Sequence, residues 1–104
     1  MTSDRLLAVL RHHVGITRGI GVADLARLLG VPERRVRKLV SECREDGVAI
    51  GAHPTTGYYI AETPEELEHC CRFLRSRALH SLRLEAQLRR IPLQELIGQL
   101  RLKT

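Results

Sequence analysis

Four basic side chains occupy five consecutive positions near the middle of the chain. They are Arg34, Arg35, Arg37 and Lys38, and a hydroxyl group follows at Ser41. An arginine guanidinium forks onto a phosphate or onto the acceptor edge of a guanine, and a lysine ammonium neutralises phosphate charge. This cluster could therefore bind a polyanion. Whether it does so depends on the helix or loop that carries it.

The run His69-Cys70-Cys71 has the residue types of a metal site but not the spacing. Successive side chains on a helix diverge by about 100°, so three consecutive ones do not converge on one ion. The other histidines lack a carboxylate or nucleophile at a telling spacing, and the sequence has no glycine-rich phosphate loop. We interpret these cysteines and Cys43 as small buried hydrophobes, and we expect no metal, no cofactor and no enzyme activity.

Composition narrows the function classes. A chain of 104 residues has room for one ordinary core but not for a separate catalytic domain. Lys and Arg number 17 against 12 Asp and Glu, and this net charge of +5 favours a polyanionic partner. Aromatic residues make up only 3%, too few for a single-strand stacking platform. Without a signal peptide or a long apolar run, we expect a cytoplasmic protein that does not contact membranes.

Capping and turn residues predict helices followed by a hairpin. Gly30 and Gly47 suit the left-handed ends of helices, and Pro32 suits the first turn of the next one. The predicted elements are a helix capped by Ser3-Asp4 and running to about residue 13, a short strand over 17–20, helices over 22–29 and 32–46, and strands over 48–52 and 58–60 joined by a five-residue loop.

This order of elements is that of a winged helix-turn-helix. The segment 22–39, VADLARLLGVPERRVRKL, resembles the DNA-binding domains of DeoR-type and biotin-ligase-type repressors. Leu25 faces the core from the second helix, Gly30 makes the tight turn, and Val36 and Leu39 anchor the third helix. The whole chain also resembles small prophage-encoded winged-helix proteins of unassigned role, which implies a phage or mobile-element setting.

The third predicted helix has two distinct faces. Its apolar side carries Val36, Leu39, Val40 and Cys43. In domains of this kind the N-terminal half of the helix enters the major groove. The residues predicted to contact DNA are Arg34, Arg35, Arg37, Lys38 and Ser41, with His53 from the wing. The wing tip has no Lys or Arg and the helix ends in acidic residues, so contact should fade past Ser41.

The C-terminal part reads as a helical extension of the winged domain. Thr63-Pro64-Glu65-Glu66 fits a capping box and predicts a helix to about Arg90; Pro92 then precedes a short amphipathic helix. We divide the chain into a winged domain over 1–61 and an extension over 62–104. The apolar stripe of the extension predicts a homodimer, with an intramolecular helical hairpin as the alternative. The candidate dimerisation residues are Leu74, Ala78, Leu82, Leu96, Ile97 and Leu100.

These observations predict a mainly α fold with a small β-hairpin wing, a winged helix-turn-helix plus a long C-terminal helical extension. The expected function is sequence-specific binding of double-stranded DNA by a transcriptional regulator of a phage or mobile element. No small-molecule ligand is expected, because the chain has no ligand-binding domain. The alternative is a protein-interaction adaptor that uses a winged-helix scaffold in replication or assembly.

Overall fold

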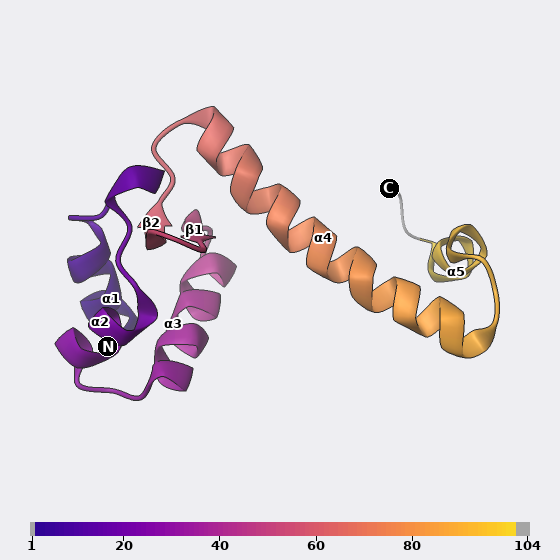
Figure 1. The fold of residues 1–104 in the computed structure, drawn as a ribbon, viewed down its shortest axis with the longest axis horizontal. Coiled ribbons are helices and arrows are strands. Elements are labelled where there is room, and N and C mark those ends of the chain that lie inside the picture. The colour runs from indigo at the N-terminus through magenta and orange to yellow at the C-terminus, as the bar shows by residue number, and fades with distance from the viewer. Residues whose placement is uncertain (1, 102–104) are drawn as a thin grey trace. The chain divides into compact units, whose positions relative to one another are not determined.

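The computed structural model describes residues 2–101, and its chain divides into two compact units, one ending at Cys70 and the other beginning at Cys71 (Figure 1). The first unit therefore includes the start of the long helix that follows the hairpin. The predicted fold class, mainly α with a small β-hairpin wing, is confirmed. The elements are α1 Thr2–Leu10, a 3₁₀ helix Ile16–Arg18, α2 Val22–Leu29, α3 Glu33–Glu45, β1 Ile50–His53, β2 Gly57–Ile60, α4 Pro64–Arg89 and α5 Leu93–Leu100.

The core of the first unit is aliphatic and draws on the apolar faces of all three N-terminal helices. Each helix contributes residues three or four positions apart, the spacing that places side chains on one helix face. These buried residues are Leu6 and Leu10 of α1, Leu25 and Leu29 of α2, and Val36, Leu39, Val40 and Cys43 of α3, together with Ile20 and Ile50. Burial on this side leaves the opposite side of α3 free to present polar groups.

The hairpin is antiparallel, with Ile50 paired to Ile60 and His53 paired to Gly57. Because His53 and Gly57 pair, the loop between the strands is three residues long, and the predicted five-residue loop is wrong. The first strand begins at Ile50 rather than residue 48, because the Val48 N–H turns back to donate to the Cys43 carbonyl at 3.0 Å. That bond closes the C-terminus of α3.

Three predictions near the N-terminus are wrong. The first helix ends at Leu10, because the His13 carbonyl accepts a hydrogen bond from the Ile60 N–H at 2.9 Å and this ties the chain to β2. The helix begins at Thr2, so Ser3 and Asp4 lie inside its first turn rather than capping it. The predicted strand over 17–20 is replaced by the 3₁₀ helix and a single bridge of Ile20 to Tyr58, because the Arg18 N–H donates to the Gly15 carbonyl at 3.0 Å and closes a helical turn.

A carboxylate joins the start of α4 to the 3₁₀ segment. The Thr63 hydroxyl accepts the Glu66 N–H at 3.1 Å, which is one of the two hydrogen bonds of the predicted capping box. The Glu66 carboxylate accepts the N–H of Glu62 at 2.8 Å and that of Ile16 at 3.0 Å. These backbone donors, Glu62 foremost, hold the pKa of Glu66 below its ordinary value.

Glu66→Gln is expected to lower the thermal midpoint of the full chain at neutral pH. A lowered pKa in the folded state means stability that is present above the ordinary glutamate pKa and is lost as pH falls through the folded value. The wild-type midpoint should therefore decline in acid more steeply than that of Glu66→Gln, measured by circular dichroism from neutral pH downward. Glu65→Gln, an exposed neighbour in the same turn, is the control. Equal midpoints for wild type and Glu66→Gln at neutral pH would contradict this role.

The second unit has a small core of its own. Ala86 of α4 and Leu96 of α5 are buried, and Leu82 and Ile97 are partly buried. The chain leaves α4 through Arg90, which has a positive φ of 58°, and the Ile91 N–H donates to the Ala86 carbonyl at 3.0 Å. Leu96 is only 1% exposed within the single chain, so it offers no surface to a second one. Among residues 2–101, no helix has the length and apolarity of a membrane span.

Candidate nucleic-acid interface

The turn between α2 and α3 fixes the direction of the basic helix. Gly30 adopts the left-handed conformation at φ 68°, and its N–H donates to the carbonyls of Ala26 and Arg27 in the last turn of α2. The Val31 N–H then donates to the Ala26 carbonyl at 3.1 Å, which completes the helix end. Pro32 follows in an extended conformation as the N-cap of α3. Three consecutive residues thus set the angle at which α3 leaves α2.

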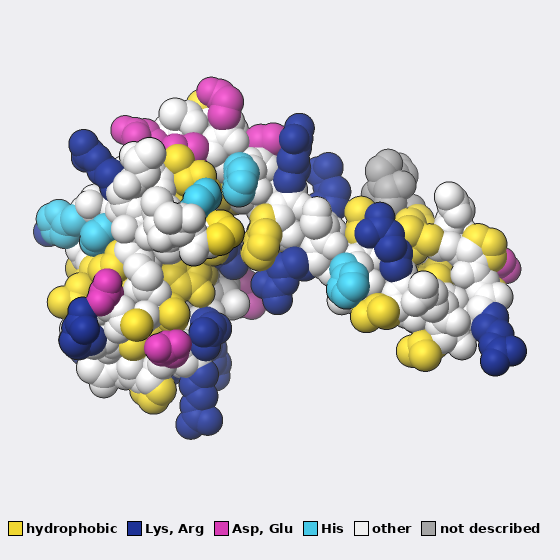
Figure 2. Space-filling view, viewed as in Figure 1, with side chains coloured by type: hydrophobic (Ala, Val, Ile, Leu, Met, Phe, Trp, Pro, Cys, Tyr) yellow, Lys and Arg dark blue, Asp and Glu magenta, His cyan; other side chains and the backbone are white. Residues whose placement is uncertain are grey.

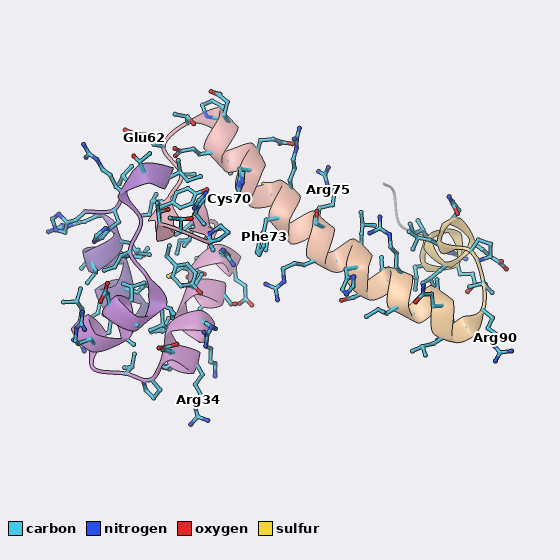
Figure 3. All side chains as sticks on the ribbon, viewed as in Figure 1. Arg34, Glu62, Cys70, Phe73, Arg75 and Arg90 are labelled. Carbon is cyan, nitrogen blue, oxygen red and sulfur yellow. The ribbon has the colours of Figure 1, made fainter. Side chains whose placement is uncertain are left out.

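The outward side of α3 carries the predicted recognition residues. Arg34, Arg37, Lys38 and Ser41 are exposed, whereas Arg35 lies half-buried on the flank. Figure 2 shows Lys and Arg side chains projecting from the first unit where Figure 3 labels Arg34, at the beginning of α3. The structure therefore brings four of the six predicted residues to one exposed helix face. Their contact with DNA stays a prediction.

Arg37 is held by a weak and replaceable partner. Its guanidinium lies 3.5 Å from the Glu33 carboxylate one turn earlier, and both side chains are about half exposed, at 58% and 49%. Exposed pairs of this kind contribute little free energy, about 0.3–0.5 kcal/mol on a helix. A phosphate or a guanine edge can therefore replace Glu33 at small cost.

Arg44, by contrast, has a structural role. Its Nε donates to the Ile50 carbonyl at 2.8 Å, where it joins the end of α3 to the first strand. Glu45 and Asp46 follow at the surface. The basic surface of α3 therefore stops at about Ser41, as its sequence predicts.

His53 lies at the base of the wing loop rather than on an open surface. Its Nδ1 accepts the backbone N–H of Thr55 at 3.1 Å and that of Thr56 at 3.4 Å. The side chain is half-buried, so its main role in this structure is to shape the loop. The ring is still part of a groove that also includes Arg37.

This groove was not anticipated from the sequence. It has a volume of about 270 Å³ and is open to solvent. Its walls come from the start of α2, from α3 and from the wing. The lining residues are Gly21, Val22, Arg37, Ala52, His53, Pro54, Thr55, Gly57 and Tyr58. The first turn of α2 begins at Gly21 without a side-chain cap, so its N–H groups add partial positive charge to this wall. The sequence has Gly21, and no Ser, Thr, Asp or Asn, at the start of α2, and this signal could have indicated the uncapped helix end in the groove wall.

The cysteines do not form a metal site in the described part of the chain. No group of three or more His, Cys, Asp or Glu side chains among residues 2–101 is placed to hold an ion. Cys43 and Cys70 are buried, as predicted, and burial raises the pKa of the Cys43 thiol. Cys71 is exposed, so its predicted burial is wrong: it lies one helical step, about 100°, from the buried face that holds Cys70.

Comparison with known proteins gives no relative for this chain: no protein-family model, curated protein or solved structure matches it.

Proposed function

We propose that this protein binds double-stranded DNA in a sequence-specific manner through the outward side of α3 and regulates transcription. The observation that carries the proposal is the division of α3 into a buried apolar side and an exposed side. The exposed side holds Arg34, Arg37, Lys38 and Ser41. The resemblance to small prophage-encoded winged-helix proteins adds that the regulated genes belong to a phage or mobile element.

The chemistry of this face suits the major groove of DNA. A helix with its side chains is about 10–12 Å wide, close to the width of the groove, about 12 Å. Arg34 and Arg37 lie three residues apart and so project from the same side of α3. Either guanidinium can donate two hydrogen bonds to the O6 and N7 atoms of a guanine. Lys38 and Ser41 would contact phosphates or base edges beside them.

The groove beside Arg37 supports a backbone contact in this proposal. A phosphate oxygen placed there would meet the guanidinium of Arg37 and the uncapped first turn of α2. Phosphate contacts of this kind set the register of a protein on the duplex but do not read sequence. The uncharged wing tip, with Thr55 and Thr56, would then act by shape and hydrogen bonding rather than by charge.

The double variant Arg37→Ala plus Lys38→Ala tests the proposal. Duplexes selected from a random pool by the wild-type chain serve as the probe, and binding is followed by fluorescence anisotropy. The variant should bind at least about 100-fold more weakly, since two contacts to DNA, one from each of the two positive side chains, are lost. Arg5→Ala plus Arg11→Ala removes the same charge from exposed positions in and just after α1 and is the matched control. Equal affinity of the α3 variant and the control would refute the assignment.

A salt titration separates DNA binding from the adaptor alternative. Affinity for a duplex falls steeply with salt because bound phosphates release counterions, with a slope set by their number. The Arg37→Ala plus Lys38→Ala variant should show a shallower slope than the wild type. An adaptor that binds through an apolar surface would show almost no salt dependence and would select no duplex from the pool.

A further inference from the structure

The second unit leaves one side of α4 apolar and exposed. Leu74, Leu84 and Leu88 belong to this side, Phe73 lies next to its edge, and Leu88 is 86% exposed. Hydrophobic side chains are visible on the surface of this unit in Figure 2. Single exposed leucines are ordinary on a protein surface, but a row of them along one helix indicates a surface that another molecule covers.

Helix geometry places these residues on a different side of α4 from the small core of the unit. At about 100° per residue, Leu74, Ala78, Ser81, Leu84 and Leu88 fall within a sector about 120° wide, which also includes the charged residues Arg77 and Glu85. The buried Ala86 and the partly buried Leu82 lie outside that sector. The apolar stripe runs over about 21 Å of α4 at 1.5 Å per residue. The core of the second unit and this stripe therefore use different sides of the same helix.

The stripe is complementary to itself when two copies run in opposite directions. With Ser81 facing Ser81 of a second copy, Leu74 lies opposite Leu88 and Ala78 lies opposite Leu84. Small side chains at the centre let the helices approach closely, and a large one faces a small one on either side. The same arrangement sets Arg77 opposite Glu85, twice by symmetry. A parallel pairing would instead bring like charges together.

We propose that a second copy of this chain covers this face, with α4 packed antiparallel against α4 about Ser81. In the single chain Arg77 lies 5.7 Å from the ring centroid of Phe73, and the Glu85 carboxylate accepts the Arg89 Nε at 2.8 Å. A carboxylate has lone pairs for more than one donor, so Glu85 can keep Arg89 and still accept Arg77 of the other copy. The interface is isologous, and each copy brings one α3 surface into the dimer. This inference does not depend on DNA binding.

Leu88→Asp tests the apolar part of the interface. Sedimentation equilibrium of the full wild-type chain should give a dimer at micromolar concentration. The variant should raise the dimer dissociation constant on the order of 1,000-fold, because the buried charge occurs twice in the interface. Leu28→Asp makes the same change at a 58% exposed position of α2 and should remain dimeric. A monomeric wild type, or a Leu88→Asp variant as dimeric as the wild type with helicity retained, would overturn the proposal.

A charge exchange tests the antiparallel register of the two α4 helices. It also tests the proposed dimer if the Leu88→Asp variant loses helicity. Arg77→Glu and Glu85→Arg should each weaken the dimer, since each sets like charges opposite one another. The double variant Arg77→Glu plus Glu85→Arg should recover it, because the new carboxylate of one copy then meets the new guanidinium of the other. Single variants as dimeric as the wild type, or a double variant no stronger than the singles, would overturn this register.

Discussion

Gly57→Ala is expected to destabilise the first unit by about 2–5 kcal/mol. Gly57 has a φ of +93°, a conformation that costs an L residue about 1–2 kcal/mol. A Cβ atom there would lie 2.4 Å from the Ile20 carbonyl oxygen and 2.7 Å from the Gly21 nitrogen. These are backbone atoms that cannot rotate away, and overpacking of this kind adds about 1–3 kcal/mol. The loss is large against a total stability of about 5–15 kcal/mol for a small domain.

Gly47→Ala separates the two contributions. Gly47 has nearly the same φ, +90°, but a Cβ there would meet nothing within 4 Å. Its substitution should therefore cost only the conformational part, about 1–2 kcal/mol. Urea unfolding of the two variants measures the difference. If both variants lost the same free energy of unfolding, the close approach of Gly57 to Ile20 would not explain why position 57 requires glycine.

The second large effect is expected at Tyr59. Among the side chains whose burial the structure describes, that of Tyr59 is the largest that is fully buried, at 0% exposure. The ring occupies space that Gly51 leaves on the paired strand, since a Cβ on Gly51 would lie 2.3 Å from Tyr59 Cζ. Tyr59→Ala should cost about 3–5 kcal/mol in urea unfolding, because it deletes a buried ring and leaves a cavity. An effect below about 1 kcal/mol would contradict this packing role.

Tyr59→Phe isolates the hydroxyl, which lies 3.8 Å from the Cys70 sulfur. Burial, followed by this hydrogen bond, raises the pKa of Tyr59 from 10.0 to about 12. An acid with a raised pKa stabilises the fold fully below its unfolded pKa and loses that contribution as pH rises through the folded one. The wild type should therefore lose stability between about pH 10 and pH 12 more steeply than Tyr59→Phe. At neutral pH the two should differ by about 1 kcal/mol or less, because a thiol is a weak hydrogen-bonding partner.

Local signals in the sequence were sufficient for the element that carries the candidate site. Gly30 predicts the end of α2, and its left-handed backbone in the structure agrees. The period of apolar residues on α3 predicts which side is buried, and Val36 and Leu39 are buried. Such features depend on residues close together in the chain, so that conformational preferences and helical period are enough to place them.

Features that join distant segments could not be predicted in this way. The Glu66 carboxylate reaches the Ile16 N–H across 50 positions. The Tyr59 ring fits over Gly51 only because of the strand register, and pairing of His53 with Gly57 shortens the loop. The groove beside Arg37 combines three segments for the same reason. The sequence could not show whether Leu96 packs within its own chain or against a second copy. The spacing of apolar residues on α5 predicts an apolar face but does not predict which segment covers that face.

The acceptor role of His53 has a consequence for the wing. A neutral imidazole has one nitrogen that accepts and one that carries hydrogen. Since Nδ1 accepts the N–H groups of Thr55 and Thr56, the proton of the neutral ring resides on Nε2. The tautomer is thus selected by the loop's own backbone. The wing has no lysine or arginine, but the neutral His53 ring keeps an N–H donor at Nε2. This donor would favour a hydrogen-bond acceptor, such as a phosphate oxygen, over a metal cation.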